Sequence, residues 1–150
     1  AYPARGGRRE DLHVFDAPGA FELSTLAAEA ARCGRFAGVV ALGCVIKGET
    51  RHDEYICHAV AQGITQAAVR TGVPIAFGLL TTENSGQARE RAGGIHGNKG
   101  EESMNALLDT IAVARAIRGK GTPAINRPVR DKAAPKGKNA PTRPRGRGAR

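Results

Sequence analysis

A turn near the middle of the sequence places a histidine where an anion could bind. The segment ALGCVIKGETRHDEYI, residues 41–56, begins with an apolar run and passes through a Lys-Gly-Glu-Thr turn to His52. A helical pattern starts at His52, so backbone N–H groups and the helix dipole would attract a negative charge to the turn. Thr50 could donate its hydroxyl to such an anion, or could instead cap the helix. His52 is the strongest candidate for general acid–base work, because an imidazole can move protons near neutral pH.

Aromatic rings occur in two further segments that would come near this turn in a parallel sheet. Residues 18–22, PGAFE, place Phe21 beside Glu22, and Phe77 lies in an apolar run over residues 73–81. Ligands of open parallel sheets bind beyond the carboxyl ends of the strands. Simpler roles remain open, since Phe21 and Phe77 could be core residues and Glu22 could compensate the dipole of the following helix.

Two cations flank or belong to a glycine-rich loop further along the chain. Arg91 precedes the segment GGIHGNKG, and Lys99 lies within it. Either cation could bind a phosphate, and a guanidinium does so with a matching fork of N–H donors. Arg91 could equally form a surface pair with Glu90 or Glu83, which would contribute little to stability. No Walker motif or GxGxxG fingerprint occurs, so a generic nucleotide-binding domain is the least favoured alternative.

The elements that must position these residues alternate between strand and helix. Apolar runs over residues 38–46 and 73–81 are typical of strands buried on both faces, and a short alternation over 11–17 predicts another strand. Apolar spacing and caps predict helices, the first with Ser24 as its cap, over residues 25–32, 52–70, 85–91 and 101–117. This order predicts an α/β fold, three-layer α/β/α with a parallel sheet.

The positive charge of the sequence is concentrated at its C-terminal end. The 150 residues include 23 Lys and Arg and 14 Asp and Glu, for a net charge of +9. Of these, 11 Lys and Arg and one acid lie in residues 118–150, whereas residues 1–117 are almost balanced. We expect a loose N-terminus over 1–10, one domain over 11–118, and a disordered basic Pro/Gly-rich tail over 119–150. The tail would act as a solubilising extension or bind nucleic acid or another polyanion weakly.

The cysteines and the hydropathy indicate a cytoplasmic protein. Cys33, Cys44 and Cys57 are an odd number of cysteines without metal-ligand spacing, which favours a reducing compartment over a disulfide framework and predicts no metal site. No stretch of about 18 apolar residues occurs, so no membrane association is expected.

Five motifs in order resemble the lumazine synthase family of riboflavin biosynthesis: PGAFEL, ALGCVIKGET-x-H-x-x-Y, GVPIAFGLLTTEN, QARERAG and GNKG. The resemblance extends from about Asp11 to Ile117 and implies a flavodoxin-like strand order. It implies a transferase that condenses 5-amino-6-(D-ribitylamino)uracil with 3,4-dihydroxy-2-butanone 4-phosphate to 6,7-dimethyl-8-ribityllumazine. Water and phosphate would leave, and no metal or organic cofactor would take part.

The resemblance also assigns roles to the residues singled out above. The pyrimidine and ribityl parts would lie against these residues: Ala20, Phe21, Glu22, Cys44, Val45, Ile46 and Phe77. The phosphate of the four-carbon substrate would be held by this group: Glu49, Thr50, Arg91 and Lys99. His52 matches the proton-transfer histidine of the family.

The resemblance has consequences for assembly and for the N-terminus. In the family the site forms between neighbouring subunits of a pentamer, and some members assemble twelve pentamers into an icosahedral shell, so a homo-oligomer is expected. Fewer residues precede PGAFE here than in the family, so the first strand, the first helix and a loop with a stacking aromatic residue are expected to be missing. The alternative function is a catalytically impaired shell or scaffold protein whose basic tail binds a polyanionic cargo.

Overall fold

Two parallel strands form the centre of the computed structural model, which describes residues 1–119. β1 (Val39–Ile46) pairs with β2 (Ile75–Thr82) along its whole length, in a register that joins Val39 to Ile75 and Ile46 to Thr82. Because α2 (His52–Thr71) connects two parallel neighbours, the unit is a βαβ crossover. The α/β class and the parallel sheet are therefore as the sequence predicts.

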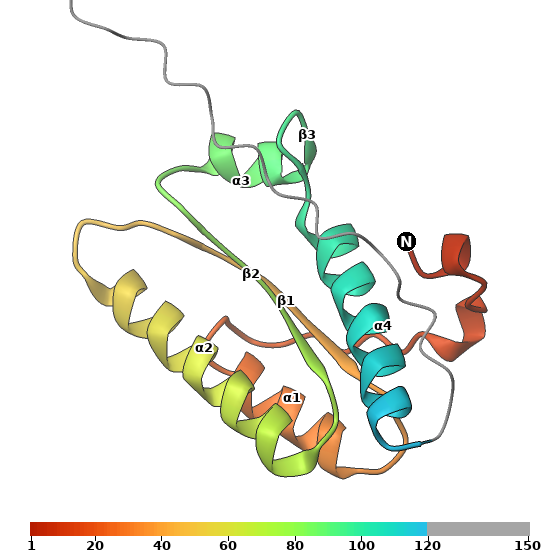
Figure 1. Ribbon diagram of the computed structural model, residues 1–150. Helices are drawn as coiled ribbons and strands as arrows, with labels where there is room; N and C mark the ends of the chain where they lie inside the picture. The colour runs from red at the N-terminus through yellow and green to blue at the C-terminus, as the bar shows by residue number, and fades with distance from the viewer. Residues whose placement is uncertain (120–150) are drawn as a thin grey trace, which may run out of the picture.

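Helices cover both faces of this pair. α1 (Leu23–Arg32) and α2 pack together on one face, and α4 (Lys99–Ile117) lies on the other, mainly over β2 (Figure 1). These three layers agree with the expected α/β/α arrangement. None of the helices in residues 1–119 is long and apolar enough to cross a membrane.

The core lies between the sheet and the α1–α2 layer. Val60 and Ile64 of α2 are almost completely buried and pack against Ala41, Val45 and Leu79 of the two strands. This cluster accounts for the alternation of buried residues along β1, since every second side chain points to α2.

The expectation that both strands are buried on both faces is wrong. Leu42 and Ile46 of β1 are about half exposed, at 52% and 46%. They alternate with the core residues and so lie on the α4 face of the sheet. α4 approaches β2 closely at Gly78, where a Cβ atom would stand 2.9 Å from Ser103 Oγ. The helix therefore covers β2 and leaves the carboxyl-terminal half of β1 open on this face.

The predicted strand over residues 11–17 is also wrong. The N-terminal segment forms two short 3₁₀ helices, η1 (Pro3–Arg5) and η2 (Arg9–Asp11), and residues 12–17 have no regular structure. Rings in this segment instead lie 5.4 Å (His13) and 6.1 Å (Phe15) from the ring of Phe36. The alternating pattern is compatible with a strand, but a strand also needs a neighbour with which to form a ladder. No strand within residues 1–119 pairs with this segment.

The helix boundaries differ from the expectations where caps differ. α1 begins at Leu23, and Ser24 does not cap it but donates its hydroxyl to the carbonyl of Val60 at 3.4 Å. α4 begins at Lys99, two residues early, because Asn98 Oδ1 accepts the backbone N–H of Glu101 at 3.1 Å. Asn98 was missed as a cap because it belongs to a segment interpreted as loop.

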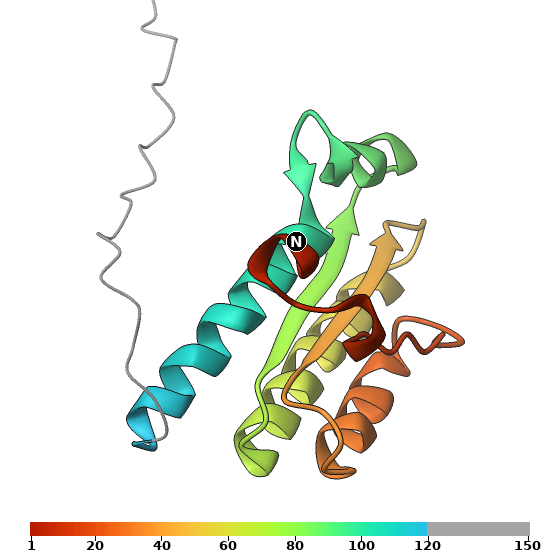
Figure 2. The same ribbon diagram turned by 90° about the vertical axis from the view of Figure 1, so that its right-hand side faces the viewer.

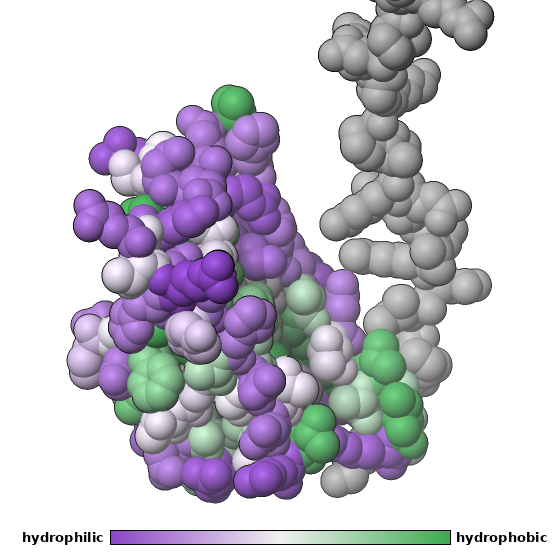
Figure 3. Space-filling view, turned by 90° about the vertical axis from the view of Figure 1, so that its left-hand side faces the viewer, coloured by the Kyte–Doolittle hydropathy of each residue, from purple (hydrophilic) through white to green (hydrophobic). Residues whose placement is uncertain are grey.

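The glycine-rich segment is an ordered corner rather than a plain loop. α3 (Ser85–Arg91) leads into a small antiparallel hairpin of β3 (Ala92–Gly94) and β4 (Gly97–Asn98), and α4 follows directly (Figure 2). On the face that Figure 3 shows, hydrophilic side chains cover most of this end of the molecule. Except for Gly119, the basic tail of residues 119–150 lies outside the described residues.

Candidate functional site

The carboxyl ends of the two strands lie side by side, as the sequence predicts. Beyond the last pair of the ladder, the N–H of Lys47 donates to the carbonyl of Thr82 at 2.8 Å. Lys47 Nζ also lies 3.0 Å from a carboxylate oxygen of Glu83, and this contact raises the pKa of the lysine. The loop that leads to α2 and the turn that leads to α3 therefore begin at one place (Figure 1).

The loop after β1 ends in a helix start that no side chain caps. Arg51 occupies the cap position of α2 without a side-chain hydrogen bond, so the interpretation of Thr50 as a cap is wrong. Residues 48–51 are exposed, and so is His52, the first residue of α2. Free N–H groups of a first helical turn attract anions. This end of the sheet thus offers backbone donors, a hydroxyl and an imidazole to a ligand.

The corner after β2 supplies a cation that is already paired. Arg91, the last residue of α3, donates from Nη1 and Nη2 to the two carboxylate oxygens of Glu102, each at 2.9 Å. Nη1 also donates to the carbonyl of His96. The hydrogen bond to Glu102 raises the pKa of Arg91. Lys99 Nζ lies 4.0 Å from the same carboxylate.

The interpretation of Arg91 as a surface residue paired with Glu90 or Glu83 is therefore wrong about the partner. In place of Glu90 or Glu83, Glu102 holds the guanidinium. Glu90 instead accepts the backbone N–H of Ile95 at 2.8 Å and so closes the hairpin. Glu83 pairs with Lys47.

The predicted aromatic residues are exposed rather than packed in the core. Phe21 is 59% and Phe77 39% exposed, so the interpretation of both rings as core residues is wrong. Glu22 is exposed at the start of α1, and Ala20 beside it is half-buried and packs against the core cluster. Two apolar rings at the surface are available to a flat ligand or to another subunit.

The remaining predicted residues, on β1, differ in accessibility. Cys44 and Ile46 are exposed, whereas Val45 is 9% exposed and packs in the core. A ligand at this strand end would therefore meet the side chains of Cys44 and Ile46 and only the backbone of Val45.

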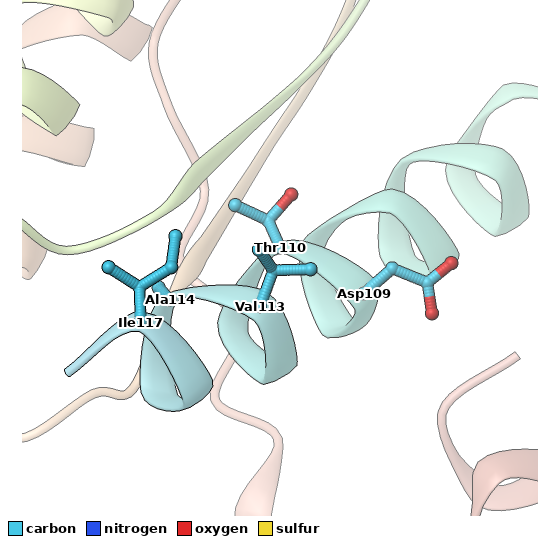
Figure 4. Close-up of a pocket in the computed structure, with 5 residues that line it drawn as sticks. All are labelled: Asp109, Thr110, Val113, Ala114 and Ile117. Carbon is cyan, nitrogen blue, oxygen red and sulfur yellow. The ribbon is translucent and has the colours of Figure 1, made fainter. Parts of the chain in front are cut away.

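Hollows lie along α4 in the described part of the chain, and one of them joins predicted site residues. A groove between β2 and α4 is lined in part by Phe77, Lys99 and Glu102. The other hollow lies at the opposite end of α4, and its lining is drawn in Figure 4: Asp109, Thr110, Val113, Ala114 and Ile117. Only the first touches the candidate site.

Sequence reasoning missed Glu102 and the Lys47–Glu83 pair. Glu102 follows Lys99 by three residues on α4, a spacing at which helical side chains of opposite charge meet, so it could have been found. The pairing of Lys47 with Glu83 depends on the strand register, which the sequence does not specify.

The predicted site residues thus lie at or beyond the carboxyl ends of two parallel strands, the place where the class of open α/β proteins binds its ligands. Comparison with known proteins makes the class specific. The model of the 6,7-dimethyl-8-ribityllumazine synthase family matches residues 1–115.

Several bacterial proteins of that name are similar to the chain. The one from Nitratidesulfovibrio vulgaris (strain DP4) is 45% identical over 112 residues, 75% of this chain and 72% of that protein. The one from Deinococcus deserti is 43% identical over 117 residues, 78% of this chain and 75% of that protein. The one from Kineococcus radiotolerans is 53% identical over 102 residues, 67% of this chain and 63% of that protein. The chain belongs to the 6,7-dimethyl-8-ribityllumazine synthase family, transferases of riboflavin biosynthesis, which favours an enzyme over the scaffold alternative.

Proposed function

We propose that the chain condenses 5-amino-6-(D-ribitylamino)uracil with 3,4-dihydroxy-2-butanone 4-phosphate and forms 6,7-dimethyl-8-ribityllumazine. The observation that carries this proposal is the junction of the two strand ends, where Lys47 bonds to the Thr82 carbonyl at 2.8 Å. It brings the uncapped start of α2, with His52, to the same end of the sheet as the turn into α3. This condensation needs a site that holds the phosphate of the four-carbon substrate and a group that transfers protons.

The phosphate would lie at the start of α2. Main-chain N–H groups at Glu49 and Thr50, with the Thr50 hydroxyl, would donate to its oxygens, helped by the dipole of the 20-residue helix. Arg91 would add a forked, charge-assisted contact and Lys99 a second positive charge. These assignments are supported by the exposure of the loop and the absence of a side-chain cap on α2.

The pyrimidine would lie against Phe21 and Phe77, with the ribityl hydroxyls donating to Glu22. Ala20 and the strand residues Cys44, Val45 and Ile46 would form the rest of this surface, Val45 through its backbone. The exposure of both rings supports this arrangement, because an exposed aromatic face can stack on a flat heterocycle.

His52 would move the protons of the reaction. The amine of the pyrimidine attacks the ketone, and an imine forms with loss of water. Phosphate is then eliminated from the four-carbon chain, and the ribityl-bearing nitrogen attacks the remaining carbonyl, so that the ring closes with loss of a second water. Each step transfers a proton to or from nitrogen, oxygen or carbon, and a positioned imidazole can do this in both directions. No strong nucleophile is needed once the two substrates are held together.

The site would be completed between subunits of a homo-oligomer, at least a pentamer, in the cytoplasm. Large apolar residues are exposed on β1 and near the candidate site, among them Leu42, Ile46 and Phe21. The three cysteines, Cys33, Cys44 and Cys57, are free thiols, as a reducing compartment would leave them. Sedimentation of the purified chain would distinguish a pentamer from a shell.

Formation of the fluorescent lumazine from the two substrates tests the proposed reaction. Purified full-length protein, with its oligomeric state verified, should release inorganic phosphate and lumazine in equal amounts. His52→Ala should retain the oligomer and lose most of the rate. An intact oligomer that forms neither product would contradict the proposal.

A further inference from the structure

Arg91 and Glu102 form a forked ion pair at the corner between α3 and α4. Nη1 and Nη2 each lie 2.9 Å from a different carboxylate oxygen, so the carboxylate occupies the whole outer edge of the guanidinium. The two side chains are only partly exposed, at 32% and 48%. Lys99, at 4.0 Å from the same carboxylate, is drawn toward it as well.

The surrounding backbone is shaped to admit this pair. Gly97 lies in the left-handed region at φ +88°, where a side chain would be strained, and a Cβ atom there would stand 3.2 Å from Glu102 Oε1 and 3.5 Å from Arg91 Nη1. Asn98 caps α4 and fixes where its first turn, with Glu102, begins. The carbonyl of His96 accepts a further N–H from Arg91. Contacts from the hairpin turn and from α4 thus hold the guanidinium.

A carboxylate and a phosphate present the same fork of two oxygens to a guanidinium. A phosphate that approaches Arg91 must therefore displace Glu102 or share the cation with it, and it meets the negative charge of Glu102 in either case. We propose that Glu102 is an internal counter-anion that competes with phosphate for Arg91 and so weakens phosphate binding at this corner. The inference rests on the proposed role of Arg91 in binding the phosphorylated substrate.

Competition from Glu102 would speed the release of the inorganic phosphate that the reaction forms. Inorganic phosphate remains at the cations after elimination, and strong binding would slow its departure. Glu102 can return to Arg91 as the phosphate leaves, so the cation does not become an unpaired charge. Glu102 is then a positioning residue, which acts on the ligand through Arg91.

Glu102→Gln tests the competition because it removes the charge and keeps the size. In the full-length oligomer, we expect the dissociation constant of inorganic phosphate, measured by calorimetry at fixed ionic strength, to fall by about threefold, the scale of an exposed ion pair. The KM for the phosphorylated substrate should fall similarly, whereas the KM for the pyrimidine substrate should stay unchanged. Glu101→Gln, an exposed neighbour on the same helical turn, is the matched control and should leave all three values unchanged.

The same substitution in an Arg91→Ala background separates the inference from the function on which it rests. If Glu102 acts through Arg91, Glu102→Gln should no longer tighten phosphate binding there. Weaker or unchanged phosphate binding by Glu102→Gln alone, with Arg91→Ala still weakening it, would overturn the competition and leave the role of Arg91 intact. Unchanged phosphate binding by Arg91→Ala would overturn both. Glu102→Ala, verified as folded by circular dichroism, should behave as Glu102→Gln does.

Discussion

The two strand ends that form the candidate site are finished in opposite ways. After β1 the chain enters α2 through exposed residues, and no side chain caps the helix. After β2, α3 is capped by Asn84, α4 by Asn98, and the cation between them is held by Glu102. At the first end the hydrogen-bond donors are open to a ligand. At the second end, the helix starts and the cation already have partners within the chain. If the two ends bind one ligand as proposed, the site would combine exposed donors with a cation that must first be released from Glu102.

The largest expected effect falls on the open end. His52→Ala should lower kcat by about 100-fold, the lower range for loss of a general acid–base group, with little change in KM. Steady-state production of lumazine measures this. His58→Ala, an exposed histidine on the same helix, is the control. A similar loss of rate in both variants would show that the open end has no special chemical role.

A substitution at the end of β2, where Arg91 is paired, should change substrate binding rather than the rate of the chemical steps. Arg91→Ala should raise the KM for the phosphorylated substrate roughly tenfold, as expected for a lost hydrogen bond to a charged group, and leave the KM for the pyrimidine unchanged. Arg89→Ala, exposed on the same helix, should change neither constant. Equal increases in both constants would mean that Arg91 supports the corner and not the phosphate.

The difference in helix capping between the two ends should appear in the free energy of unfolding. Asn98→Ala should lower the free energy of unfolding by about 1 kcal/mol, because α4 loses the acceptor for the Glu101 N–H. Thr50→Ala should have no measurable effect, since Thr50 caps nothing. Urea unfolding of the two variants provides the measurement. A comparable loss from Thr50→Ala would show that both ends are capped alike.

The smallest effect belongs to the contact that joins the two ends. Glu83 raises the pKa of Lys47 above its ordinary 10.5, so the pair stabilises the fold below that pH, and this stabilisation disappears as the pH rises through the higher folded pKa. Thermal midpoints of the wild type and Lys47→Ala should differ slightly at pH 7 in low salt. They should converge once the pH exceeds the raised pKa of Lys47, or at high salt. A difference that persists under those conditions would indicate packing rather than charge.

Much of the fold follows from periodicity in the sequence. The apolar runs that form β1 and β2 and the spacing of Val60 and Ile64 on α2 identify the βαβ unit and its core. Residues 11–17 show where such reasoning fails. Their alternation is local, whereas strand formation depends on a partner elsewhere in space, and no strand of the described residues pairs with them.

The sequence was enough to name candidate site residues, but it did not show which of their charges are paired. His52 and Thr50 follow directly from their place after an apolar run. The state of Arg91 does not, because its partner Glu102 lies 11 residues away and the hairpin between them folds back through Gly97. A chain that reverses direction creates pairs that no helical or strand period encodes.

Because β1 has one strand neighbour among the described residues, its amides should exchange hydrogen for deuterium at alternating rates. The N–H of Val39 donates to Pro74, just before β2, and that of Lys47 donates to Thr82, the last residue of β2. N–H groups alternate in direction along a strand. Those of Val40, Leu42, Cys44 and Ile46 therefore point to the other edge of β1, where no strand of residues 1–119 pairs. Labelling along β1 should show slow and fast amides in turn. If another segment or subunit pairs with that edge, the exchange of every second amide along β1 should slow.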